Sequence, residues 1–143
     1  MSKKIYIIRH GETDFNLQGI VQGSGVDASL NDTGRGQGRA FYQRYKEVPF
    51  DLVITSKLKR TAETVSDFIE AGLPTISFAE INEMSWGDHE GKKGTEASIA
   101  EYQKIKDGWE KGEIDGRIGG GESAREMGAR LEKFIDVLRE RPE

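Results

Sequence analysis

The sequence predicts an α/β protein, a three-layer sandwich in which helices cover both faces of a mostly parallel sheet. Short apolar runs rich in β-branched residues alternate with segments whose apolar residues recur at helical spacing, a pattern typical of such sheets. Polar and charged residues follow each apolar run at once, as they do where a buried strand leaves a sheet. The 143 residues fit a single domain, 1–143.

Three strands are predicted, over residues 4–8, 50–55 and 75–78. The first contains a continuous apolar run, Ile5 to Ile8, as expected of a strand buried on both faces, and the second is also read as a buried strand. Three strands form a small sheet for the number of helices predicted. Residues 141–143 follow the last helix directly, at the point where the alternating pattern predicts a further strand. We therefore expect the domain to lack its C-terminal part and the natural chain to continue beyond Glu143.

Four helices are predicted, near residues 31–48, 58–69, 99–112 and 123–138. Asn31 and its two successors are good N-caps for the first helix, although three glycines weaken its first half. Ser123 and Glu126 form a capping box that begins the last helix. Tyr102 and Trp109 lie on the apolar stripe of the third helix, so we expect them in the core. The helices are joined by loops over residues 17–30, 82–95 and 119–121.

Composition excludes several classes of protein. Lys and Arg total 21 against 25 Asp and Glu, a net charge of −4 that argues against nucleic acid as a partner. The sequence holds no cysteine, which rules out disulfides, thiolate nucleophiles and cysteine-bound zinc. No apolar run approaches membrane-spanning length, and the first one is too short for a signal peptide. We expect a cytoplasmic enzyme or binding domain that does not engage a membrane.

The sharpest motif, Ile8-Arg9-His10-Gly11-Glu12-Thr13, directly follows the first predicted strand, with Asn16 three residues further on. Ligands bind at this edge of open α/β sheets. Arg9 offers a planar fork that matches two phosphate oxygens, and a neutral His10 can attack phosphorus. Gly11 lets the backbone approach closely, and Asn16 adds a neutral donor. A surface arginine beside a structural histidine is the alternative reading.

The other two strands are also followed by reactive side chains. Ser56 ends the second strand, and Arg60 lies in the first turn of the next helix, where anions bind. Glu83 comes shortly after the third strand, and a carboxyl group held beside a phosphate favours its protonated form. Together these groups would suffice for phosphoryl transfer without a metal.

These residues, in this order, resemble the signature of the histidine phosphatase superfamily, which includes cofactor-dependent phosphoglycerate mutases. Besides the first motif, the resemblance rests on Gln22-Gly23, Leu30, Gly34, Gln37, Ser56, Arg60, Thr61, Glu83, Gly87, Glu90-Gly91 and Gly121-Glu122-Ser123. It therefore covers nearly the whole chain, and it implies the α/β sandwich predicted above.

The resemblance also implies roles for individual residues. His10 would be transiently phosphorylated, with Arg9, Arg60 and Asn16 holding the phosphate. Glu83 would be the general acid and then the base for the attacking water. Gln22 and Gly23 would lie at the substrate mouth, and neither a metal nor a cofactor would be needed.

The sequence departs from the family at one important point. The family carries a second catalytic histidine in a His-Gly step, after a strand that follows the last helix. The second histidine here is His89, in the loop after Glu83. We expect His89 to be a rim or structural residue and the missing histidine to lie beyond Glu143. The family often has alanine in place of Gly38, which we expect to affect packing alone.

Four functions remain open on the sequence. A phosphatase acting on a small phosphorylated metabolite is favoured, because the span from Glu83 to Glu122 is shorter than in the mutases. The mutase, a phosphate-binding module without turnover, and a metallohydrolase using His10 and His89 are the alternatives. A homodimer is also kept as an option.

Overall fold

The computed structural model describes residues 2–143. Helices dominate it, and two short strands form its sheet. In chain order the elements are α1 (Asp14–Gln18), α2 (Asp32–Tyr45), β1 (Val53–Ser56), α3 (Lys59–Thr64), α4 (Ser66–Glu70), β2 (Thr75–Phe78), η1 (Ala79–Ile81), η2 (Gly87–His89), α5 (Glu96–Glu110) and α6 (Ala124–Glu140).

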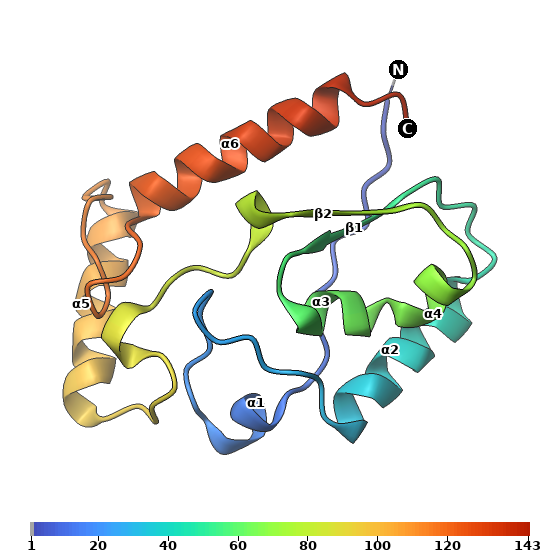
Figure 1. Ribbon diagram of the computed structural model, residues 1–143. Helices are drawn as coiled ribbons and strands as arrows, with labels where there is room; N and C mark the ends of the chain where they lie inside the picture. Colours follow the sequence, from blue (N-terminus) through green and yellow to red (C-terminus); the bar gives the residue numbers. More distant parts are fainter. Residues whose placement is uncertain (1) are drawn as a thin grey trace.

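The sheet is parallel, as predicted. β1 pairs with β2 in a register that runs from Val53 opposite Thr75 to Ser56 opposite Phe78. Figure 1 shows α6 along one side of the two strands, with α2, α3 and α4 on the other side. Phe134 of α6 contacts Phe78 of β2, with ring centroids 5.3 Å apart. The layered α/β architecture predicted from the alternating pattern is therefore confirmed.

The prediction of a buried first strand is wrong. Residues 4–8 are extended, but their main chain pairs with neither strand and makes no other backbone hydrogen bond within residues 2–143. Ile7 is 92% exposed and Ile5 59%, whereas Tyr6 packs on Phe50 with ring centroids 5.1 Å apart. One face of the segment thus meets the aromatic cluster around α2, and the other faces solvent.

Helix α2 begins where the capping signal predicts, because the Asn31 side chain accepts a hydrogen bond from the Gly34 amide at 2.9 Å. Gly34 and Gly38 lie one turn apart and are both buried. A Cβ on Gly34 would overlap the carbonyl oxygen of Glu12, and one on Gly38 would lie 2.6 Å from that of Thr64. The two glycines therefore let α2 pack directly on the main chain of Glu12 and of Thr64. Gly38 in particular allows a close contact between α2 and α3.

The remaining elements follow the prediction with several differences. The second strand, predicted over residues 50–55, is Val53–Ser56, and the short helix η2 lies within the predicted loop 82–95. The predicted helix over residues 58–69 is divided into α3 and α4 at Val65, whose φ of −112° and ψ of 18° leave the helical region. The short helix α1, capped by Thr13, was not predicted. Within residues 2–143, no helix combines the length and the apolar character needed to cross a membrane.

Candidate functional site

The ring of His10 is held in one tautomer. Its Nδ1 lies 2.7 Å from the carbonyl oxygen of Gly11. Because a carbonyl can only accept, Nδ1 carries the proton, and the lone pair is on Nε2. Burial lowers the pKa of His10 below its ordinary value of 6.5, and the positive charges of Arg60 and Arg9 act in the same direction. The ring is therefore neutral at pH 7, with Nε2 available as a nucleophile.

The loop that carries His10 is fixed by buried hydrogen bonds. The Gly11 amide donates to Thr64 Oγ1 at 2.9 Å, and that hydroxyl donates to the Arg60 carbonyl at 2.6 Å. The N-terminal segment is thereby joined to α3, the helix that supplies Arg60. The sequence analysis expected His10 and Arg60 to lie close together at one edge of a sheet. They do lie close together, but the hydrogen bonds of Thr64 join their segments, and no strand pairing does so within residues 2–143.

A cavity of about 360 Å³ lies beside His10. Five of the seven residues predicted for the site line it: Arg9, His10, Asn16, Gln22 and Glu83. The Asn16 side-chain oxygen accepts from the Thr13 amide and hydroxyl, both at 3.0 Å, so its amino group remains to donate into the cavity. The side-chain oxygen of Gln22, Oε1, is buried and has no hydrogen-bond partner within the described chain.

Arg60 and Gly23 do not line this cavity but lie behind its wall. Arg60 is 1% exposed, and its guanidinium donates to the Val26 carbonyl at 2.6 Å and to the Gly23 carbonyl at 3.5 Å. Its Nε–H is buried and lacks a partner among residues 2–143. Burial lowers the pKa of Arg60, and the nearby Glu83 opposes that shift. Arg60 therefore acts on the site through its positive charge, which reaches His10, rather than as a lining group of the cavity.

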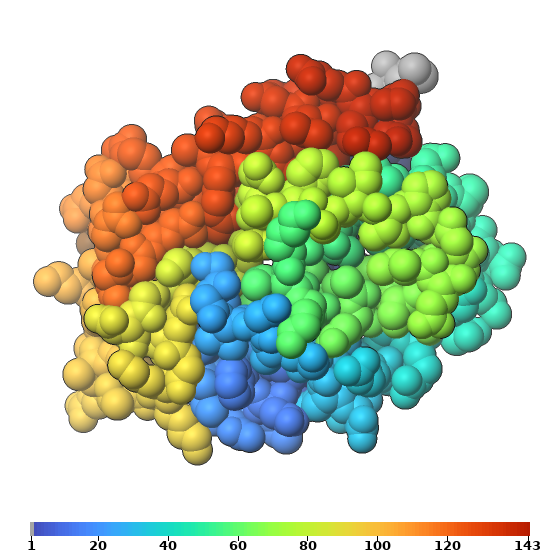
Figure 2. Space-filling model, viewed as in Figure 1, coloured from blue at the N-terminus to red at the C-terminus, as the bar shows by residue number. Residues whose placement is uncertain are grey.

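Residues 17–30 form the wall that brings Gln22 to the cavity. Figure 2 shows this blue segment between the green surface of residues near 60 and the yellow surface of residues near 85–92. On one side the Ser24 amide donates to the Met84 carbonyl at 3.2 Å; on the other the Lys59 amide donates to Asp27 at 2.8 Å. The loop therefore connects α3, which carries Arg60, with the segment that carries Glu83.

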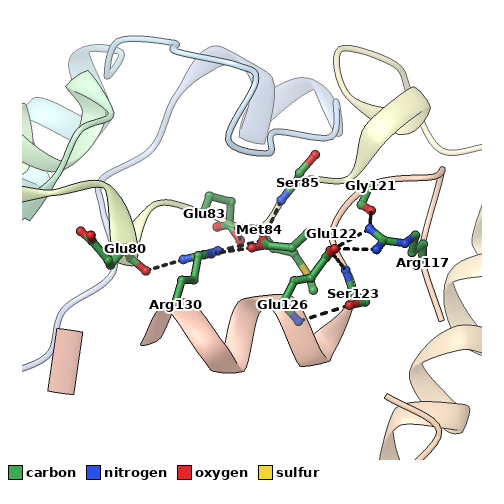
Figure 3. Close-up of polar contacts among 10 residues, drawn as sticks. All are labelled: Glu80, Glu83, Met84, Ser85, Arg117, Gly121, Glu122, Ser123, Glu126 and Arg130. Carbon is green, nitrogen blue, oxygen red and sulfur yellow. Dashed lines mark hydrogen bonds and ion pairs between the residues drawn. The ribbon is translucent and has the colours of Figure 1, made fainter. Parts of the chain in front are cut away.

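Glu83 is held on a segment that α6 secures. Its Oε1 accepts from the Met84 amide at 3.0 Å. Arg130 of α6 donates to both oxygens of Glu122, at 2.6 and 3.0 Å, and to the carbonyl of Glu80 (Figure 3). The Glu122 amide in turn donates to the Ser85 carbonyl at 2.9 Å. The Gly121-Glu122-Ser123 motif thus fixes the chain on both sides of Glu83.

A larger cavity of about 460 Å³ lies on the α6 side of Glu83. Both of its arginines are already paired with carboxylates, Arg117 with Glu126 and Arg130 with Glu122. Figure 3 shows both ion pairs, with dashed lines that join each arginine to its glutamate near the start of α6. No nucleophilic histidine lines it. The smaller cavity beside His10 is therefore the candidate active site.

Several residues of the smaller cavity were missed by the sequence analysis. Tyr102, expected in the core, is 40% exposed and lines the cavity with Trp86, Ile99 and Ile118. His89, which was expected to be a rim or structural residue, also lines the cavity, and its Nε2 lies 2.8 Å from Glu101. Helical spacing identifies the apolar face of α5 but does not distinguish a face on the core from one on a cavity. Trp109, which was also expected in the core, is only partly exposed.

Within the described chain, His, Asp and Glu side chains form no group of three or more that could hold a metal ion. His89 is engaged by Glu101. The metallohydrolase alternative therefore has no set of ligands in residues 2–143.

A neutral imidazole and the Arg9 guanidinium line a metabolite-sized cavity, and the buried Arg60 adds a second positive charge behind them; together they define an anion-binding site on an α/β protein. The family model described as "Histidine phosphatase superfamily (branch 1)" matches residues 5–143. The chain belongs to this superfamily, as the sequence motifs indicated.

Individual relatives carry both phosphatase and mutase names. "Uncharacterized phosphatase PhoE" of Bacillus subtilis is 39% identical over 90 residues, 61% of this chain and 45% of the relative. "Probable phosphoglycerate mutase GpmB" of Serratia proteamaculans is 33% identical over 145 residues, 98% of this chain and 65% of the relative. The solved alpha-ribazole phosphatase of Shigella flexneri matches 93% of this chain and 65% of its own, with a TM-score of 0.76 and 30% identity. The chain thus spans about half to two-thirds of the length of these relatives.

Proposed function

We propose that the protein hydrolyses a small phosphomonoester through a phosphohistidine on His10. The observation that carries the proposal is the Nδ1–H···O=C bond to Gly11, which leaves Nε2 unprotonated inside a cavity shared with Arg9, Asn16 and Glu83. The superfamily membership and the phosphatase-named relatives support it.

In the first step His10 Nε2 forms a bond to phosphorus, and the bond from phosphorus to the ester oxygen breaks. Arg9 and the Asn16 amino group bind the equatorial oxygens, and the buried Arg60 adds its positive charge from behind the cavity wall. Protonated Glu83 gives its proton to the departing oxygen, which leaves as an alcohol. In the second step Glu83 takes a proton from water, the water attacks phosphorus, and the N–P bond breaks to release phosphate. No metal takes part.

The phosphohistidine can be trapped by mixing the protein with p-nitrophenyl phosphate and denaturing it in alkali. We expect one phosphoryl group on the peptide that contains His10, none in His10→Ala, and turnover that survives EDTA. Phosphate found on the peptide containing His89 would overturn the assignment of the nucleophile. Phosphate binding without release from p-nitrophenyl phosphate would support the non-catalytic module instead.

The mutase-named relatives favour a second candidate, a cofactor-dependent phosphoglycerate mutase. It predicts that the phosphoryl group moves between positions of phosphoglycerate and that turnover requires a bisphosphoglycerate primer. Release of free phosphate alone, without primer, would exclude it.

A further inference from the structure

The lining of the candidate active site divides into two chemically distinct ends. The end beside His10 is polar, with Arg9, Asn16, Gln22 and Glu83. The remainder is formed chiefly by apolar side chains from other elements: Val21, Trp86, Ile99, Tyr102 and Ile118. A phosphoryl group occupies only the polar end, so the group attached to it meets the apolar wall.

The apolar wall has an aromatic centre. The ring centroids of Trp86 and Tyr102 lie 5.9 Å apart at an interplanar angle of 52°, and the buried Ile118 lines the same cavity. Ile99 lies about one turn before Tyr102 on α5, and these two side chains are 60% and 40% exposed. Apolar side chains left exposed along a cavity gain from covering by an apolar ligand.

The charges at this end disfavour a second anionic group on the ligand. His89, the basic residue of the apolar end, is bonded to Glu101 at 2.8 Å. The Gly119 amide and His89 hold the pKa of Glu101 below its ordinary value, so its carboxylate stays ionised. Lysine is absent from the cavity lining within the described chain. A ligand carboxylate or second phosphate would therefore find no free cation among the lining residues of this end, because His89 is already paired with the ionised Glu101.

We propose that the substrate is a phosphomonoester whose leaving group carries an uncharged aromatic ring, which packs against Trp86, Ile99 and Tyr102. This inference rests on the proposed phosphatase function and names its substrate class. It makes α5 the element that determines specificity, and it disfavours phosphoglycerate as the natural substrate.

The test compares 2-phenylethyl phosphate with ethyl phosphate, whose alcohols have similar acidity, so that ring contacts rather than leaving-group chemistry decide the outcome. We expect kcat/KM to be about tenfold higher for the phenylethyl ester, the gain typical of an aromatic contact. In Tyr102→Ala the ratio of the two values should fall severalfold. The control Ile135→Ala changes an apolar residue of α6 that is equally exposed, at 43%, but lies outside the cavity, and should keep the ratio.

Binding of phosphonates separates this inference from the proposed function. Benzylphosphonate should bind more tightly than methylphosphonate, as measured by tryptophan fluorescence, and Tyr102→Ala should reduce the difference. If neither ester is hydrolysed, the phosphatase proposal fails, and the phosphonate preference still decides whether the aromatic subsite exists. Equal kcat/KM for the two esters, or a preference that Tyr102→Ala leaves intact, would overturn the inference while the phosphatase proposal stands.

Discussion

Replacing Arg130 by methionine is expected to destabilise the protein far more than loss of a surface charge. Arg130 and Glu122 are only 19% and 16% exposed, and the guanidinium also donates to the Glu80 carbonyl. Removing one partner of a fully buried ion pair costs about 3–5 kcal/mol. Because some solvent reaches this pair, we expect about 2–3 kcal/mol here. With a urea slope of about 2 kcal/mol/M, the unfolding midpoint falls by about 1–1.5 M.

The same helix supplies a matched control. Arg125 binds Asp115 through two hydrogen bonds of 2.6 and 3.0 Å, but the two side chains are 62% and 72% exposed. Arg125→Met should therefore cost at most about 1 kcal/mol. Adding Glu122→Gln to Arg130→Met removes the buried charge and should recover part of the loss. Equal midpoint shifts for Arg130→Met and Arg125→Met would refute the argument from burial.

Three further predictions concern other parts of the chain. Because neutral His10 is the proposed nucleophile and burial lowers its pKa, kcat/KM should hold down to pH 6.5 and decline only below it; an acid limb centred above 6.5 would contradict this. Gly34→Ala should destabilise by about 1–3 kcal/mol through overlap with Glu12. Gly36→Ala, whose Cβ would make only an ordinary contact of 3.9 Å with the Arg39 side chain, should stabilise by up to about 1 kcal/mol in urea melts. Ser123→Ala removes the cap of α6 and should cost about 1 kcal/mol in the same assay, and no loss would contradict the capping role.

Elements with local signals were predictable from the sequence. β2 matches its predicted range of residues 75–78, and α6 begins directly after its capping box, because caps and short β-branched runs act within a few residues. Residues 4–8 show the opposite case. An apolar run has the composition of a buried strand, but a strand forms only where a neighbouring strand accepts and donates its main-chain hydrogen bonds. The run itself does not show whether such a neighbour is present.

The candidate site was predictable to a similar degree. The motif around His10 and the position of Glu83 identified one end of the cavity, because chemistry of this kind requires particular residue types. The apolar end was missed, since Trp86 and Tyr102 are unremarkable in sequence and acquire their place through the packing of α5. The covering of Arg60 by the Gly23 and Val26 carbonyls was not foreseen either, because it depends on the path of a loop.

The glycine contact beneath His10 has a consequence for how such a protein can diversify. Where α2 meets residues 11–12, Gly34 puts main chain against main chain, so the position of the candidate nucleophile depends on the absence of a Cβ as well as on the hydrogen bonds of Thr64. Ile99 and Tyr102, in contrast, are accessible side chains of α5 and can be exchanged without entering the interior. The residues that position the proposed nucleophile and those proposed to contact the substrate's leaving group therefore lie in separate segments of the chain. Under the proposed function, substitutions along α5 would change which esters fit the cavity while the proposed nucleophile stays in place.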